Sequence, residues 1–131
     1  MNASGGDIFE KKKAGSEMTA IWVAAGGALG AVARYVAVGL FSFPLGTLTV
    51  NVLGSFLIGV AFVLLPKGGW SPFLITGVLG GFTTFSAFSL DTLKLIETGK
   101  LGPAFGYIAA SVILSLAAAA IGVFLARGAV A

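Results

Sequence analysis

Long apolar stretches alternate with short polar breaks along this chain, and the pattern predicts four membrane-spanning helices. The stretches cover residues 20–41, 46–65, 72–93 and 103–126. Each is close to the ~20 residues that a helix needs to cross ~30 Å of hydrocarbon. Small residues at four-residue spacing, such as Gly26 and Gly30, favour close packing between the spans. All the loops are short, so any activity must be carried out by the spans or by their ends.

The composition agrees with a membrane protein and excludes several functions. Of the 131 residues 57% are hydrophobic and only 10% are charged, and the mean hydropathy is +1.03. We therefore expect an all-α membrane protein. The chain has no cysteine and no histidine, which removes thiol chemistry, the usual transition-metal ligands and the commonest general base. We expect no enzyme, and the thinly spread net charge of +3 gives no basic face for nucleic acid.

The first 17 residues differ from the rest of the chain. They are polar, and three acidic residues balance three lysines. They lack the apolar core of a secretory signal. We interpret residues 1–17 as a disordered leader, with Met18 as a natural start, and residues 18–131 as a four-helix transmembrane domain.

The orientation of the chain in the membrane is only weakly specified. The lysines and arginines of short loops set the orientation of a membrane protein. Counted from Met18, Lys67 and Arg127 fall on one side, and Arg34, Lys94 and Lys100 fall on the other. Two copies could therefore insert in opposite directions and pair about an axis in the membrane plane. A single orientation, set by other features, stays open as the alternative.

Two spans carry a polar stripe along one helix face. Residues four apart in a helix share a face, and this spacing holds for Thr47, Asn51 and Ser55 and again for Tyr107, Ser111 and Ser115. Neutral hydrogen-bond donors in series can replace the water around an anion. They bind it weakly, whereas a lysine would hold it tightly and slow its exit. The alternative is that these groups join helices, and for Asn51 both interpretations stay open.

The third span contains the unusual run GGFTTFSAFSLD, residues 80–91. Its first five residues fall near the middle of the span. Glycine destabilises the interior of a helix, and a threonine hydroxyl can hydrogen-bond to a backbone carbonyl of the preceding turn. We therefore predict that the helix is locally unwound near the middle of the membrane. Freed carbonyls need a partner in lipid. Where two antiparallel chains cross, they could hold a small cation such as sodium, or the glycines could simply permit close crossing.

Two of the eleven phenylalanines stand in a polar context. Most are expected to face lipid, but Phe85 and Phe88 are flanked by Thr84, Ser86 and Ser89. The edge of an aromatic ring is electropositive. Rings presented edge-on could therefore stabilise a small, hard anion without a fixed charge.

Taken together, the runs GGFTTFSAFS, GGALGAVARY and GTLTVNVLGSF and the spacing of the last polar stripe resemble the Fluc (CrcB) fluoride channels. The resemblance extends from Met18 to Arg127. It implies a multi-pass protein of the bacterial inner membrane that releases fluoride passively from the cytoplasm and so gives fluoride resistance. It also implies an antiparallel, dual-topology homodimer with two pores, a third helix broken at the midplane and a structural sodium ion, Na+, at the dimer axis.

The resemblance assigns roles to individual residues. It places Phe85 and Phe88 in the pore as a pair, and Asn51 on the pore wall. The remaining fluoride-pathway residues are Thr84, Tyr107, Ser111 and Ser115. The backbone carbonyls of Gly80 and Thr83 are expected to hold the sodium, and Arg34 is expected in the vestibule. Ile113 and Ala87 stand where some relatives carry serine and threonine, so the number of hydroxyls along the pathway stays open.

Two other classes of protein were weighed. A small dual-topology cation or drug exchanger, or a proton-coupled fluoride exchanger, needs a membrane-embedded carboxylate. None lies between Ala20 and Leu90, and Asp91 is expected to be an ordinary flank at the end of the third span. A non-transporting scaffold would give no ion flux and would be insensitive to changes in the polar stripes.

Overall fold

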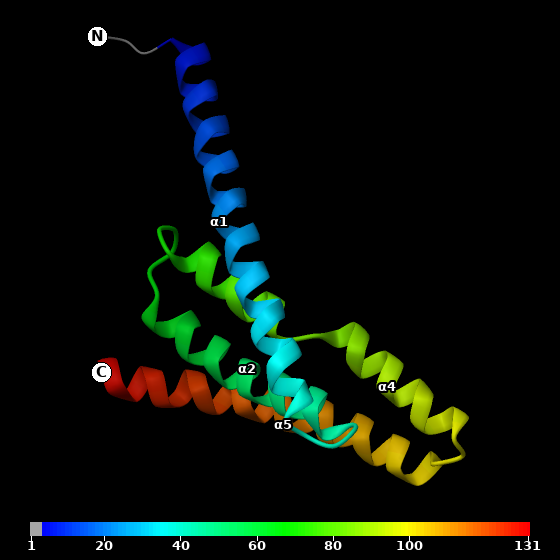
Figure 1. Cartoon of the computed structure of the whole chain (residues 1–131). Coiled ribbons are helices and arrows are strands. Elements are labelled where there is room, and N and C mark those ends of the chain that lie inside the picture. Colours follow the sequence, from blue (N-terminus) through cyan, green and yellow to red (C-terminus); the bar gives the residue numbers. More distant parts are fainter. Residues whose placement is uncertain (1–3) are drawn as a thin grey trace.

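The computed structural model describes residues 4–131, and its regular elements are all helical (Figure 1). The elements are α1 (Gly5–Gly39), α2 (Leu45–Leu64), the π-helix η1 (Pro72–Leu79), α3 (Gly80–Phe82), α4 (Phe85–Glu97) and α5 (Leu101–Val130). Four helical segments are long and apolar enough to cross a membrane, the third being the run from η1 to α4. The prediction of an all-α protein with four spans is thus confirmed.

The spans pack as two pairs, and α4 leans away from both. α1 lies against η1 and α3, while α2 runs along α5 (Figure 1). α4 contacts mainly the first part of α5. There Leu95 of α4 packs against Ala104 and Tyr107 of α5 in a buried cluster. The splayed position of α4 leaves a groove between it and the α2–α5 pair.

Glycines allow the paired helices to touch through their backbones. A methyl group on Gly26 or Gly30 of α1 would overlap a carbonyl oxygen of η1. A methyl group on Gly59 of α2 would overlap a carbonyl of α5, and one on Gly122 of α5 would overlap a carbonyl of α2. Such contacts are typical of helices in lipid, where packing replaces the hydrophobic effect as the driving force.

The leader is helical where the structure describes it. Residues 1–3 lie outside the described part, and α1 begins at Gly5 with Ser4 as its cap, since the Ser4 hydroxyl accepts from the Asp7 amide at 3.4 Å. Residues 5–17 are therefore not the disordered segment that we predicted. Lysine and glutamate favour helices, and no proline separates them from the first span. Met18 as a start and residue 18 as a domain border stay predictions.

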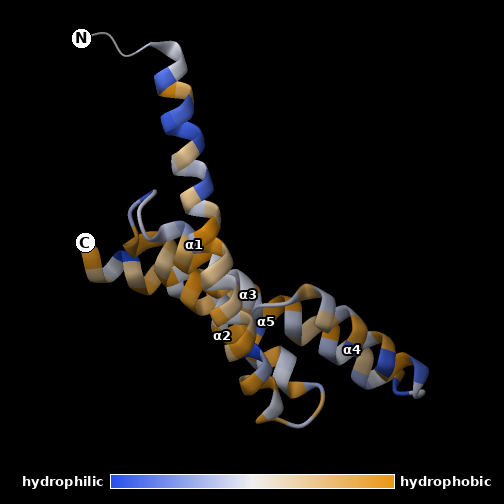
Figure 2. Ribbon diagram, turned by 45° about the horizontal axis from the view of Figure 1, so that its top comes forward, coloured by the Kyte–Doolittle hydropathy of each residue, from blue (hydrophilic) through white to orange (hydrophobic). Residues whose placement is uncertain are grey.

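α1 is longer than a membrane is thick. Its 35 residues rise by about 52 Å, against ~30 Å for the hydrocarbon core. Figure 2 shows that the part of α1 nearest the N-terminus is mostly hydrophilic, with a few apolar positions, and that the rest is largely apolar. The polar turns therefore extend beyond the bundle.

Candidate functional site

The third span is interrupted at two threonines. Thr83 (φ −88°, ψ 155°) and Thr84 (φ −154°, ψ 118°) are extended and separate α3 from α4. The Thr83 amide and hydroxyl both donate to the Leu79 carbonyl, each at 3.0 Å. The Thr84 hydroxyl accepts from the Ala87 amide at 3.1 Å and caps α4. Each threonine side chain thus stabilises the end of the helix beside it.

Asn51 of α2 satisfies the backbone of the interruption. Its side-chain nitrogen donates to the Thr84 carbonyl at 2.9 Å, and its oxygen accepts from the Thr84 amide at 2.8 Å. Both backbone groups of an extended residue inside a span would otherwise lack partners. Asn51 therefore joins α2 to the interruption, and it also lines the groove described below.

Arg34 of α1 holds the other side of the interruption. Its Nε donates to the Gly81 carbonyl at 3.0 Å. In a continuous α-helix that carbonyl would accept from the amide of Phe85. The guanidinium therefore takes the place of a helical amide. Arg34 also lines a cavity of about 550 Å³ together with Thr47 and Asp91, and its predicted role in a vestibule stays a prediction.

A groove of about 560 Å³ lies between the interruption, α2, α4 and α5. Six of the seven predicted pathway residues line it, namely Asn51, Thr84, Phe85, Phe88, Ser111 and Ser115. Gly80 and Thr83, the predicted cation positions, line it as well. Residues from three separate spans thus converge on one space.

Three aromatic rings form a series beside the groove. The ring centroids of Phe85 and Phe88 lie 5.4 Å apart with planes at 55°, and those of Phe88 and Tyr107 lie 5.3 Å apart with planes at 43°. Phe85 is 76% exposed, whereas Tyr107 is buried. The series therefore leads from the surface of the chain to its interior. Tyr107, the remaining predicted pathway residue, lies at the inner end rather than on the groove wall.

Ser111 lines the groove, but its hydroxyl is covered by protein. The residue is only 6% exposed, and its Oγ is buried and makes no hydrogen bond of good geometry within the described residues. It lies close to the Tyr107 side chain. In this conformation the hydroxyl therefore cannot be reached from the groove, and the side chain has to turn before it can donate to an anion or a water molecule there.

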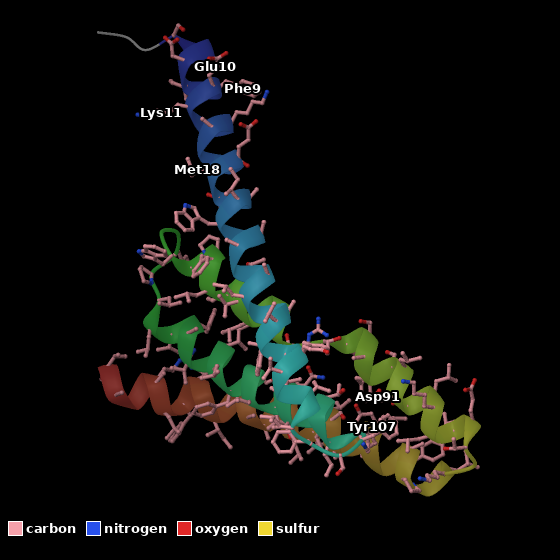
Figure 3. All side chains as sticks on the ribbon, viewed as in Figure 1. Phe9, Glu10, Lys11, Met18, Asp91 and Tyr107 are labelled. Carbon is pink, nitrogen blue, oxygen red and sulfur yellow. The ribbon has the colours of Figure 1, made fainter. Side chains whose placement is uncertain are left out.

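Asp91 does not behave as the ordinary flank that we predicted. It is 9% exposed, and its carboxylate accepts from the Tyr107 hydroxyl at 3.3 Å (Figure 3). α4 continues to Glu97, so Asp91 lies within the third span. The sequence held a signal for this position, since Phe88, Asp91 and Leu95 share one helix face.

Comparison with known protein families gives a match over most of the chain. The model of the family described as "CrcB-like protein, Camphor Resistance (CrcB)" matches residues 21–123. A protein of Cereibacter sphaeroides is 54% identical over 114 residues, which cover 81% of this chain and 92% of the relative. One of Paracoccus denitrificans is 51% identical over 118 residues, or 84% and 95%. One of Rhizobium meliloti is 55% identical over 117 residues, or 80% and 93%. All three are named fluoride-specific ion channel FluC.

Proposed function

Because the chain belongs to the CrcB-like family, we propose that it is a fluoride-selective channel of the bacterial inner membrane. It lets fluoride leave the cytoplasm passively and so gives resistance to fluoride. The protein is a multi-pass membrane protein and not an enzyme. The observation that supports the proposal most is that six predicted pathway residues, which come from three separate spans, line one groove.

The groove can select a small anion without binding it tightly. In the proposal, neutral donors come from the Ser115 hydroxyl and, once its side chain turns toward the groove, from the Ser111 hydroxyl. The tilted rings of the aromatic series supply electropositive edges. Fluoride is the smallest halide, so it gains most from short contacts that replace its water. No lysine or arginine lines the groove among the described residues, and weak sites in series allow the ion to leave.

The interruption supports a structural sodium ion. In a continuous helix the Gly80 carbonyl would accept from the Thr84 amide, which instead donates to Asn51. The Thr83 carbonyl would accept from the Ala87 amide, which instead donates to the Thr84 hydroxyl. These two carbonyls lose their helical partners, and neutral carbonyls of unwound helices are ligands for sodium. In the proposal, Gly80 and Thr83 of two chains hold one ion at the axis between them.

The exposed face of α4 supports an antiparallel homodimer. Ser86 and Ser89 are exposed within the third span, next to Phe85. Their hydroxyls already have partners, since Ser86 bonds to the Thr84 hydroxyl and Ser89 donates to the Phe85 carbonyl. Polar side chains are nevertheless unfavourable next to lipid, and a second copy would cover this face. The nearly even count of basic residues on the two sides of the chain, starting from Met18, permits the second copy to insert in the opposite direction.

The dimer proposal can be tested with single cysteines, because the chain contains none. Ser42→Cys and Ala131→Cys lie at opposite ends of the spans and are exposed. Dual topology predicts that a membrane-impermeant thiol reagent labels about half of each variant in intact cells. Full labelling of one variant and none of the other would contradict it.

The channel proposal can be separated from exchange by the movement of protons. Vesicles loaded with potassium fluoride and containing the purified protein should release fluoride only after valinomycin lets potassium follow. An exchanger of fluoride for protons also moves net charge, but it carries protons into the vesicle as fluoride leaves, and a pH indicator inside the vesicle reports this uptake. Proton uptake coupled to fluoride release would favour exchange, and no release with or without valinomycin would favour a scaffold.

A further inference from the structure

Three aromatic side chains from separate segments meet at one end of the bundle. Trp22 of α1, Trp70 of the loop before η1 and Phe73 of η1 form this aromatic cluster. Their ring centroids lie 5.6, 6.0 and 5.9 Å apart, and the planes meet at 62°, 88° and 76°. Trp22 is nevertheless 46% exposed and Trp70 63% exposed. The rings hold each other in place and still present a large surface outward.

We propose that the aromatic cluster is an interfacial anchor that binds the boundary between the acyl chains and the headgroups of the bilayer. Indole combines an apolar ring with an N–H donor, and it is enriched at this depth in membrane proteins. The sequence beside the aromatic cluster changes from polar to apolar at the same level. Lys67 lies in the loop that carries Trp70, and the polar turns of α1 end at Glu17, just before Trp22.

The length of α1 agrees with this position. At a rise of ~1.5 Å per residue, α1 covers about 26 Å between Trp22 and its last residue, Gly39, close to the ~30 Å of the hydrocarbon core. At the far end, the Lys94 ammonium lies 6.0 Å from the Phe43 ring centroid. A basic and an aromatic side chain therefore also mark the opposite boundary.

The anchor would also set the depth of the interruption. From Phe73 to Thr83 the chain rises by at most about 15 Å, which is half the hydrocarbon thickness. With the cluster at the headgroup boundary, the extended threonines lie near the middle of the bilayer. This consequence adds to the proposed function, but the anchor itself does not depend on which ion is conducted.

The polar turns of α1 then lie outside the hydrocarbon. Figure 3 shows Phe9, Glu10 and Lys11 on the part of α1 that extends away from the bundle, with Met18 closer to it. An anchor at Trp22 keeps these residues on the aqueous side of the boundary. The helical leader is thus a projection from the membrane surface rather than part of a span.

The tryptophan fluorescence of the unaltered protein tests the anchor directly. The chain contains two tryptophans, and both belong to the cluster. The protein is reconstituted in phosphatidylcholine vesicles brominated either close to the headgroup or close to the end of the acyl chains. We expect the shallow bromines to quench the emission at least twice as strongly as the deep ones. Stronger quenching by the deep bromines, or none by either lipid, would overturn the proposal.

A deep reference makes the comparison quantitative. Leu114 is 47% exposed, lies near the middle of α5 and does not line the groove. Leu114→Trp, combined with Trp22→Phe and Trp70→Phe, should reverse the order of quenching by the two lipids. An identical order in this variant and in the unaltered protein would also overturn the assignment. Valinomycin-dependent fluoride release is measured on the same vesicles, so failure of the anchor and failure of the channel proposal are distinguished.

Discussion

The side-chain amide of Asn51 pairs with both backbone polar groups of Thr84, at 2.9 Å to the carbonyl oxygen and 2.8 Å from the amide nitrogen. The contact joins the middle of α2 to the one place where the third span leaves the helical conformation. It satisfies the extended backbone inside the membrane, where water is not available. One uncharged side chain thus fixes the interruption next to the groove.

Asn51→Asp should destabilise the protein and reduce fluoride release. One carboxylate oxygen can still accept from the Thr84 amide, but the other faces the Thr84 carbonyl, so this carbonyl loses its donor. Loss of a buried hydrogen-bond partner costs about 1–3 kcal/mol. Thermal unfolding in detergent and fluoride release from vesicles measure the two effects. Thr49→Ala is the control on the same helix, because its hydroxyl donates only to the Leu45 carbonyl one turn away. Equal behaviour of the two variants would remove the role given to Asn51.

Ser111→Ala should separate stability from transport. The substitution removes a buried hydroxyl that makes no hydrogen bond of good geometry within the described residues, so the unfolding midpoint should stay nearly the same. Fluoride release should fall by about tenfold or more, because the groove loses a donor. Ser16→Ala, at an exposed position of the polar turns of α1, should change neither quantity. A less stable Ser111→Ala protein with normal release would show that the hydroxyl is structural.

Phe85→Ile and Phe88→Ile should impair fluoride release while the proposed dimer survives. An isoleucine keeps apolar volume but has no electropositive ring edge. Phe124→Ile is a matched control for the outer ring, since Phe124 and Phe85 are both 76% exposed and only Phe85 lines the groove. Release rates from vesicles and the elution volume in detergent report transport and assembly. Normal rates in both groove variants would refute the role of the rings.

Asp91→Asn should retain fluoride release that depends on valinomycin. The amide oxygen can still accept from the Tyr107 hydroxyl, so the contact between α4 and α5 survives the loss of charge. A proton-coupled exchanger would instead lose transport, because an amide cannot carry the proton. Asp91 is a buried carboxylate within the third candidate span, and this variant decides whether transport needs a carboxylate at this position.

Hydropathy and spacing were sufficient to predict the spans and most of the groove. Each of the four apolar stretches is long enough to cross a membrane once. The polar stripes through Asn51 and Ser111 follow from helix geometry. The run of glycines and threonines marked the interruption because both residue types weaken a helix. These features depend on residues close together in the sequence.

The unpredicted features depend on contacts between distant segments. Arg34 lies on α1, and nothing near it indicates that its guanidinium would replace a helical amide at Gly81. Asp91 was judged by its distance from the end of a span, whereas its burial follows from Tyr107 of the next helix. The π-helical spacing of η1 has no signal in the residues of Pro72–Leu79.

The most direct test of the account is the ratio of fluoride to chloride release from the same vesicles. Vesicles that contain the protein are loaded with equal concentrations of potassium fluoride and potassium chloride, and both ions are followed by selective electrodes after valinomycin is added. We predict that fluoride is released within the measurement while chloride stays at the level of protein-free vesicles. Equal release of the two halides would contradict a groove whose neutral donors and ring edges select the smallest of them.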